Sequence, residues 1–280
     1  MNVSSDLKNI FLKSNLFKEN TKKKYNYNNK INGINAILWL NLDISVDRRK
    51  YMEKILNKIN IKNIRIKSVD GVNFDIKNTY IDYENSKKIN FAETLINSEL
   101  ATTLSHFKAF NFIKNLDGDF FLICEDDICF KNVKYFKNLD LNKIIKESPK
   151  FDILTLYKTK INKLNDLYTE VNEFNKDEKK DHIWGAVAYI ITKKYANKLS
   201  QIISYNKENN KFTINTEKPI SQSDIFIFSF GKAYVYKYNF ISTKINKSLI
   251  HSFNKNNHKL LHEKSNKNQL KYILKDFNLK

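Results

Sequence analysis

An acidic triplet, Glu125, Asp126 and Asp127, directly follows the apolar run 120–124. Because this run lies between turn-forming residues at 117–119 and the triplet, it is predicted to be a buried strand that delivers three carboxylates to its end. Ligands of open α/β sheets bind at the carboxyl ends of the strands, and adjacent carboxylates are stabilised by a cation. We therefore predict a divalent metal with a phosphate-bearing ligand here. A polar turn is the alternative.

A sheet must position the acidic triplet, and predicted strands and helices alternate along the chain in the way that forms one. Apolar, β-prone runs predict strands at 34–42, 64–69, 120–124, 151–157, 186–191 and 233–238. Apolar spacing predicts helices over 52–59, 99–113 and 193–203. Residues 164–180 and 205–216 are polar and are expected to be exposed loops. This alternation indicates an α/β fold with helices on both faces of a sheet.

Length and composition indicate a folded chain. The 280 residues are 41% hydrophobic and 13% aromatic, which excludes global disorder. The net charge of +19 suits phosphate or an anionic membrane face, but the lysines are scattered along the chain rather than clustered. We therefore predict no nucleic-acid partner and allow peripheral contact with a membrane. Cys124 and Cys129 are expected to be small buried residues.

The two ends of the chain differ from its middle. Residues 1–32 are a polar N-terminal segment, 33–250 are expected to form the domain, and 251–280 are a basic C-terminal tail. The beginning of the chain contains no continuous apolar signal-peptide core and no stretch long enough to span a bilayer. A cytoplasmic protein is predicted, with any membrane contact peripheral and at the inner face.

Five motifs occur in an order and spacing that together resemble one family. They are Leu-Asn-Leu-Asp with Asp-Arg-Arg at 40–43 and 47–49, Ser-Val-Asp-Gly at 68–71, a segment ending in Ser-His at 98–106, the acidic triplet, and a strand and helix at 185–191 and 196–199. Over about 34–251 the chain resembles glycosyltransferase family 25, the lipooligosaccharide galactosyltransferases and the related collagen hydroxylysine galactosyltransferases. Ser98, Ala101 and Thr102 replace the family's usual Gly, Gly and Cys, so the shape of this turn is expected to differ.

The resemblance implies a GT-A type fold, which is a Rossmann-like mixed sheet with helices on both faces. It also implies an inverting transferase that moves a hexose, with galactose favoured, from a UDP-sugar to a glycan or glycoprotein, such as lipooligosaccharide or a collagen-like hydroxylysine. Mn²⁺ or Mg²⁺ would act as a Lewis acid toward the diphosphate leaving group. The alternative is a non-catalytic or degenerate module that binds UDP or anionic polymers through its basic surface.

The donor site is predicted from residues near strand ends. Arg48 and Arg49 follow the first strand, and guanidinium groups suit a diphosphate, with a surface pair as the alternative. Asp70 is placed to meet uracil or ribose unless its motif is only a turn. The resemblance implies that His106 hydrogen-bonds the donor. The alternative is that His106 only packs a helix against the sheet. The full predicted set is Asn41, Asp43, Arg48, Arg49, Asp70, Ser105, His106, Glu125 and Asp126.

The metal ligands are predicted from the triplet and from a later histidine. Residues two apart in an extended segment face the same side, so Glu125 and Asp127 converge on one ligand while Asp126 points elsewhere. Asp127 is the expected direct ligand, with Glu125 or Asp126 on ribose or a metal-bound water. His251, near the C-terminal end of the chain, is a further candidate metal ligand. The alternative is a solvent-exposed histidine in the tail.

An inverting transferase needs a carboxylate that deprotonates the acceptor hydroxyl. Asp224 is the best-placed candidate for this base, and Asp181 and Asp152 are the alternatives. Asp224 could instead cap a helix. Trp184 is a candidate for the acceptor site, because sugars pack their C–H faces on aromatic rings, and a core tryptophan is the alternative.

Overall fold

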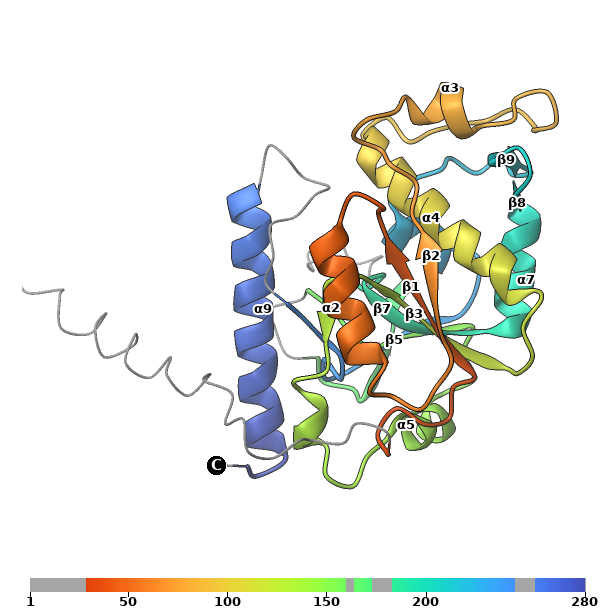
Figure 1. Ribbon diagram of the computed structural model, residues 1–280. Coiled ribbons are helices and arrows are strands. Elements are labelled where there is room, and N and C mark those ends of the chain that lie inside the picture. Colours follow the sequence, from red (N-terminus) through yellow and green to blue (C-terminus); the bar gives the residue numbers. More distant parts are fainter. Residues whose placement is uncertain (1–28, 160–163, 173–182, 245–254, 280) are drawn as a thin grey trace, which may run out of the picture.

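A computed structural model describes residues 29–159, 164–172, 183–244 and 255–279 (Figure 1). A seven-stranded sheet forms its centre, and residues 1–28 of the polar N-terminal segment lie outside the described part. The strands of the sheet are β1 (Ala36–Asn41), β2 (Asn63–Lys67), β3 (Phe120–Glu125), β5 (Ile153–Thr155), β6 (Tyr168–Glu170), β7 (Ala188–Thr192) and β10 (Ala233–Tyr236). Two smaller pairs are β4 (Ile128–Cys129) with β11 (Ser242–Thr243) and β8 (Ile203–Asn206) with β9 (Lys211–Ile214).

The sheet is mixed, and its strands follow the order β2-β1-β3-β7-β5-β10-β6. β1 is parallel to both β2 and β3, whereas β7 is antiparallel to β3 and β5. Helix α2 (Val46–Leu56) is the crossover that parallel pairing of β1 with β2 requires. The predicted α/β class with a Rossmann-like mixed sheet is therefore confirmed. The carboxyl ends of β1, β2 and β3 meet at one edge.

Helices cover both faces of this sheet (Figure 1). Helices α4 (Asn97–Ile113), α7 (Lys193–Ile202) and α8 (Ser223–Phe228) pack on one face, and α2, α5 (Leu141–Glu147) and α9 (Lys255–Asp276) on the other. Two short helical turns are α3 (Ile76–Tyr80) and η2 (Val133–Tyr135). Alternation along β1 sends Leu38 to the first core and Trp39 to the second, because successive side chains of a strand face opposite sides.

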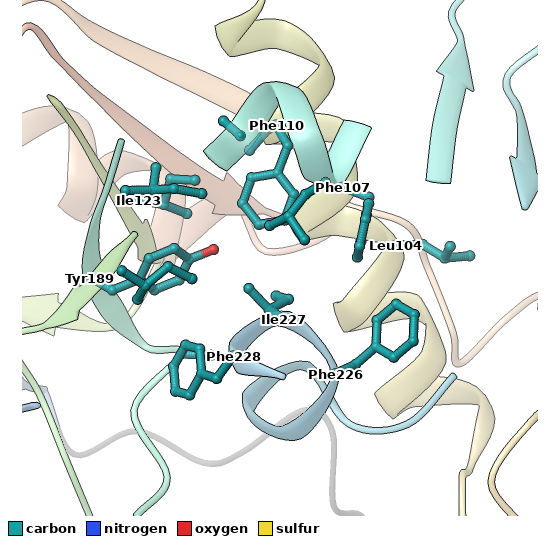
Figure 2. Packing of buried hydrophobic residues seen from close by; sticks show 14 of the residues in the cluster. Leu104, Phe107, Phe110, Ile123, Tyr189, Phe226, Ile227 and Phe228 are labelled. Carbon is teal, nitrogen blue, oxygen red and sulfur yellow. The ribbon is translucent and has the colours of Figure 1, made fainter. Parts of the chain in front are cut away.

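The core beneath α4 fixes this helix against the sheet. Figure 2 shows Phe107 and Phe110 of α4 between Ile123 and Tyr189 of the sheet and Phe226 of α8. The ring centroids of Phe107 and Phe226 are 5.8 Å apart, and all five side chains are fully buried. Burying an aromatic side chain contributes about 1.5–3 kcal/mol. The N-terminal half of α4 is thereby held at the edge where the parallel strands end.

Two segments differ from the loops expected from sequence. Residues 203–214 contain the antiparallel pair β8 and β9, because Phe212 and Ile214 alternate with polar residues and are fully buried. Residues 168–170 form β6, an edge strand paired with β10, and Val171 beside it is buried. The expectation of exposed loops was wrong where these strands form, at 168–170 and at 205–206 and 211–214, because a few buried apolar residues stabilise strand pairing in an otherwise polar sequence. Residues 173–182 lie outside the described part.

The segment described as a basic tail contains helix α9, which packs on the second core. Ile273 is fully buried there. Ser265 Oγ donates to the carbonyl of Lys158 at 3.0 Å, and Gln269 Oε1 accepts from Lys158 Nζ at 3.4 Å. These contacts fasten α9 to the sheet. No helix in the described part of the chain has the length and apolar character needed to cross a membrane.

Candidate active site

A cavity of about 420 Å³ opens at the edge where the parallel strands end. Its walls come from the end of β1, the turn after β2, the N-terminal half of α4, the acidic triplet, the loop before β7, the start of α8, β11 with the residue after it, and α9. Seven predicted site residues line it: Asn41, Arg48, Ser105, Glu125, Asp126, Asp127 and Asp224. Segments far apart in the sequence therefore converge on one concave site, as expected at the carboxyl ends of parallel strands.

Both carboxylate oxygens of Asp126 are bound by other side chains of the protein. Its Oδ1 accepts from Arg48 at 2.7 Å, and its Oδ2 accepts from Asn41 Nδ2 at 2.6 Å. The residue is 6% exposed. Because both of its oxygens are engaged, Asp126 positions Arg48 and the end of β1 rather than offering a free carboxylate to a ligand.

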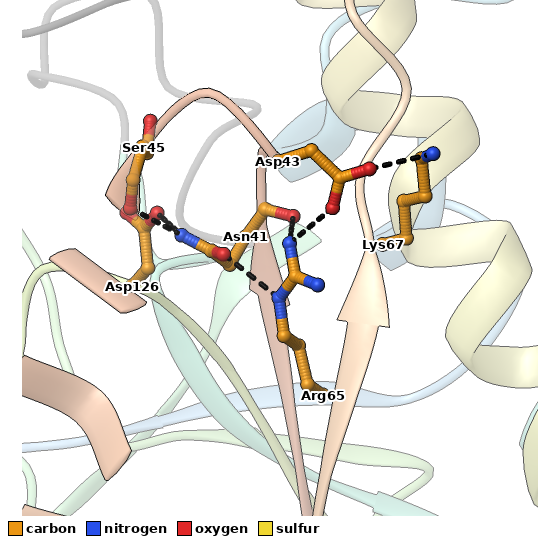
Figure 3. Close-up of polar contacts among 6 residues, drawn as sticks. All are labelled: Asn41, Asp43, Ser45, Arg65, Lys67 and Asp126. Carbon is orange, nitrogen blue, oxygen red and sulfur yellow. Dashed lines mark hydrogen bonds and ion pairs between the residues drawn. The ribbon is translucent and has the colours of Figure 1, made fainter. Parts of the chain in front are cut away.

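Asn41 connects Asp126 to a second charged group (Figure 3). Its Oδ1 accepts from Arg65 Nε at 2.8 Å, so its amide is held from both sides. Arg65 in turn contacts Asp43 Oδ1 at 2.5 Å, and Lys67 lies 2.6 Å from Asp43 Oδ2. Hydrogen bonds from Lys67 and Arg65 lower the pKa of Asp43. Asp43 was predicted to bind the donor, but it does not line the cavity and instead anchors Arg65.

Glu125 and Asp127 are the carboxylates of the triplet that stay available to a ligand. Burial raises the pKa of Asp127 to about 6, with Arg48 acting in the opposite direction. Burial also raises the pKa of Glu125 well above its ordinary value, and repulsion from Asp127 and Asp224 adds to this. Oδ1 of Asp127 is buried and makes no hydrogen bond with the described residues. An unpartnered buried carboxylate oxygen beside a second carboxylate is a suitable place for a cation.

Of the three predicted metal ligands, Glu125 and Asp127 are among the described residues. Among the described residues no three His, Cys, Asp or Glu side chains are grouped so as to hold a metal ion. His251, the predicted third ligand, lies outside the described residues. Two carboxylates still fit a cation such as Mg²⁺, which commonly binds one or two protein carboxylates and takes its other ligands from phosphate and water.

Asp224 lies at the first turn of α8, and its carboxylate reaches across to the loop before β7. Its Oδ1 accepts from the backbone N–H of Gly185 at 2.5 Å and of Ala186 at 2.6 Å. The helix cap of α8 is Gln222, so the alternative role of Asp224 as a cap was wrong. Burial raises the pKa of Asp224, although the two N–H groups act against this. A carboxylate with a raised pKa and a fixed orientation suits a general base.

Gly185 is essential to this tether, because its position leaves no room for a side chain. A Cβ built there would lie 2.5 Å from Thr155 Oγ1 and 2.7 Å from the carbonyl oxygen of Tyr157. We expect Gly185→Ala to displace the N–H groups that hold Asp224 and to lower the free energy of unfolding by about 1–3 kcal/mol. Denaturant unfolding and steady-state transfer rates would check this. A variant with unchanged stability and rate would show that the loop yields without moving Asp224.

Ser105 and His106 have different roles in the structure. Ser105 lines the cavity, where its Oγ donates to the carbonyl of Ala101 at 2.7 Å and accepts from Val69 N–H at 2.9 Å, so it fastens the turn after β2 to α4. His106 is fully buried, and its Nδ1 lies 2.8 Å from the hydroxyl of Tyr189. Burial lowers the pKa of His106 to about 3, so this ring is neutral. The structure therefore places His106 in the core and not at the donor site.

Asp70 and Arg49 do not line the cavity. The carboxylate of Asp70 accepts from the backbone N–H of Val72 at 2.9 Å and from the side chain of Asn73 at 2.7 Å. These hydrogen bonds close a turn, which was the alternative role predicted for Asp70. Val72, in the same turn, does line the cavity. Asp70 thus shapes the wall without presenting its own side chain.

The adjacent arginines form a matched pair for mutation. We expect Arg48→Ala to lower the free energy of unfolding by about 2–4 kcal/mol, because it leaves the buried Asp126 without its cation. Arg49→Ala is expected to stay within about 0.5 kcal/mol, as surface substitutions usually do. Urea unfolding of both variants would measure the difference. Equal effects would mean that the contact between Arg48 and Asp126 contributes little.

Several lining residues were not identified from the sequence. Lys244 follows β11 and donates its backbone N–H to the carbonyl of Asp127 at 2.6 Å. His262 of α9 has Nδ1 2.5 Å from the hydroxyl of Tyr157, and the two rings are stacked. Glu99, inside the motif at 98–106, also lines the cavity. Only Glu99 had a sequence signal, because Lys244 and His262 lie in polar stretches without a motif.

Fold and site together define an α/β protein with an acidic cavity at the carboxyl edge of a mixed sheet. The family model described as Glycosyltransferase family 25 (LPS biosynthesis protein) matches residues 34–215, and the chain belongs to this family. The family inferred from the motifs is therefore confirmed. Asp224, Lys244 and His262 lie beyond the matched region.

Two further comparisons accompany this family match. A similar solved structure is that of HddC from Yersinia pseudotuberculosis, with 13% sequence identity, a TM-score of 0.34, and coverage of 75% of this chain and 73% of that chain. The comparison with curated proteins found no match. The family assignment therefore depends on the family model alone.

Proposed function

We propose that this chain is an inverting hexosyltransferase of lipopolysaccharide biosynthesis, with a GT-A type fold, a UDP-sugar donor and a divalent cation. Galactose is the proposed sugar. One observation carries the proposal: Glu125, Asp127 and Asp224 line a single cavity, and one oxygen of Asp127 is buried without a partner among the described residues. Membership of family 25 supports the transfer of a sugar as the reaction.

Glu125 and Asp127 are the proposed holders of Mn²⁺ or Mg²⁺. When bound, the cation neutralises the charge that develops on the departing diphosphate. The raised pKa values of the two carboxyl groups support this role, because their cause is burial together with repulsion between neighbouring carboxylates, which Arg48 offsets only in part. A cation would relieve that repulsion.

Arg48 and the turn after β2 are the proposed donor contacts. Arg48 lines the cavity with its guanidinium held by Asp126, so it is oriented before a diphosphate arrives. Ser105 holds the backbone of Val69 in the same wall. These contacts form a fixed surface for the nucleotide part of the donor.

Asp224 is the proposed base. It accepts the proton of the acceptor hydroxyl as that oxygen bonds to the anomeric carbon, while the bond from that carbon to the UDP oxygen breaks on the opposite face, which inverts the configuration. The tether to Gly185 and Ala186 engages Oδ1 and fixes the direction of the carboxylate. The net charge of +19 favours an anionic acceptor or contact with an anionic membrane face.

A thermal-shift titration with UDP-galactose, with and without Mn²⁺, tests this function. We expect the melting temperature to rise with UDP-galactose and Mn²⁺ together, because a ligand that binds only the folded state stabilises it. UDP-glucose and UDP-N-acetylhexosamines in the same assay would report the sugar preference. A shift produced equally by any polyanion, and abolished by salt, would instead support binding through the basic surface.

A further inference from the structure

The cavity wall beside Asp224 carries an aromatic ring. Trp184 lines the cavity and is 36% exposed, whereas the chain's other tryptophan, Trp39, is 2% exposed in the core. The alternative of a core tryptophan at 184 was therefore wrong. An aromatic ring that forms part of a cavity wall is a suitable surface for the C–H face of a sugar ring.

Trp184 is held in place by the contacts that hold the proposed base. Its carbonyl oxygen accepts from Thr159 N–H at 3.1 Å. The two residues that follow it, Gly185 and Ala186, donate their N–H groups to Asp224. The indole ring and the carboxylate are therefore attached to the same short backbone segment, the ring covalently at Trp184 and the carboxylate through the N–H groups of Gly185 and Ala186.

Polar side chains suited to hydroxyl groups lie on the same cavity. Glu99 Oε2 accepts from Gln222 Nε2 at 3.2 Å, and both residues line the cavity. Gln222 is two residues before Asp224, so this pair adjoins the base. A carboxylate and an amide accept and donate hydrogen bonds in the way that sugar hydroxyls require.

The side chains named beside Asp224 differ in charge from those beside the triplet. The guanidinium of Arg48 is bound to Asp126, and Lys244 contacts the carbonyl of Asp127 through its backbone N–H while its ammonium group lies over the ring of Tyr51. The side chains named around Asp224 are Trp184, Glu99 and Gln222, and they contribute no positive charge. Such a wall favours a neutral ring with hydroxyl groups over a phosphate or a cation-seeking group.

We propose that Trp184, Glu99 and Gln222 form the acceptor subsite, in which a pyranose ring stacks on Trp184 and presents one hydroxyl to Asp224. This inference rests on the proposed function and specifies its acceptor class as a saccharide. A hydroxylysine side chain has no flat C–H face to stack on an indole, so a collagen-like peptide is the disfavoured acceptor.

Intrinsic fluorescence tests the subsite without turnover. Binding of methyl β-galactopyranoside or methyl α-mannopyranoside is expected to change the emission of Trp184, while the buried Trp39 stays constant. Trp184→Phe should abolish this change. An emission that no methyl glycoside alters in the wild-type protein overturns the subsite. If the emission changes but no UDP-hexose is ever hydrolysed or transferred, the subsite stands and the proposed function fails.

Kinetics separate the acceptor subsite from the donor site. For Trp184→Leu we expect the KM for the methyl glycoside to rise about tenfold, with a smaller rise for Trp184→Phe, which keeps an aromatic face. The KM for UDP-galactose, which reports the donor site, should change less than the acceptor KM in both variants. Phe112→Leu, at an exposed aromatic residue of α4 outside the cavity, is the matched control. An unchanged acceptor KM in Trp184→Leu, or a hydroxylysine peptide that is used better than the glycosides, would overturn the proposal.

Discussion

Asp224→Asn is expected to lower the rate of sugar transfer by ~10²–10⁴, the usual contribution of a general base. The fold should persist, because the asparagine oxygen can accept the same N–H groups of Gly185 and Ala186 that Oδ1 accepts. The KM for the donor should change little, since Asp224 acts on the acceptor. Steady-state kcat with UDP-galactose, together with the melting temperature of each protein, measures both parts.

Asp152 provides the matched control for Asp224. Its Oδ2 also accepts a backbone N–H, from Lys232 at 2.9 Å, but the residue does not line the cavity. Asp152→Asn should therefore keep the wild-type rate. The pH profile adds a second readout: because the pKa of Asp224 is raised, activity should fall at a higher pH on the acid side than for an ordinary aspartate, and the variant should lack this limb. A wild-type kcat in Asp224→Asn would show that another group is the base.

Asp127→Asn is expected to reduce transfer at least ~10²-fold by weakening the cation and, with it, the stabilisation of the departing diphosphate. The same variant should make the protein without metal more stable above about pH 6. Asp127 has a folded pKa of about 6 against 3.8 for an ordinary aspartate, so the folded state binds the proton more tightly. Stability from this group is therefore greatest at low pH and decreases as the pH rises from 3.8 through 6.

Two measurements check the effects at Asp127. The melting temperature at pH 7.5 without metal should rise by a few degrees in the variant, and added Mn²⁺ should stabilise the wild-type protein but not the variant. Asp119→Asn, at an exposed aspartate just before the other end of β3, should respond to Mn²⁺ like wild type. An Asp127→Asn protein that is still stabilised by Mn²⁺ and still transfers sugar would exclude Asp127 as a ligand.

The sequence predicted the elements that carry the site better than the side chains that face it. The apolar run before Glu125 specified β3, since a buried central strand needs apolar residues on both faces. Arg48 and Arg49, by contrast, are indistinguishable in sequence, and only the direction of α2 places Arg48 against Asp126. The Ser-His pair shows the same limit: Ser105 faces the cavity, whereas His106, one position later on α4, faces the core.

The sequence by itself determined the family, the α/β class and the acidic strand end, because these depend on local order and spacing of residues. The tertiary structure decided which carboxylates of the triplet bind other side chains and which face the cavity. Asp126 is used by Arg48 and Asn41, whereas Glu125 and Asp127 stay open to the cavity. The tertiary structure also places Asp224 in the same cavity as the triplet, because the sheet order and the contact with the loop before β7 position it there. Contacts between residues about a hundred positions apart are set by packing, and no local pattern in the chain encodes them.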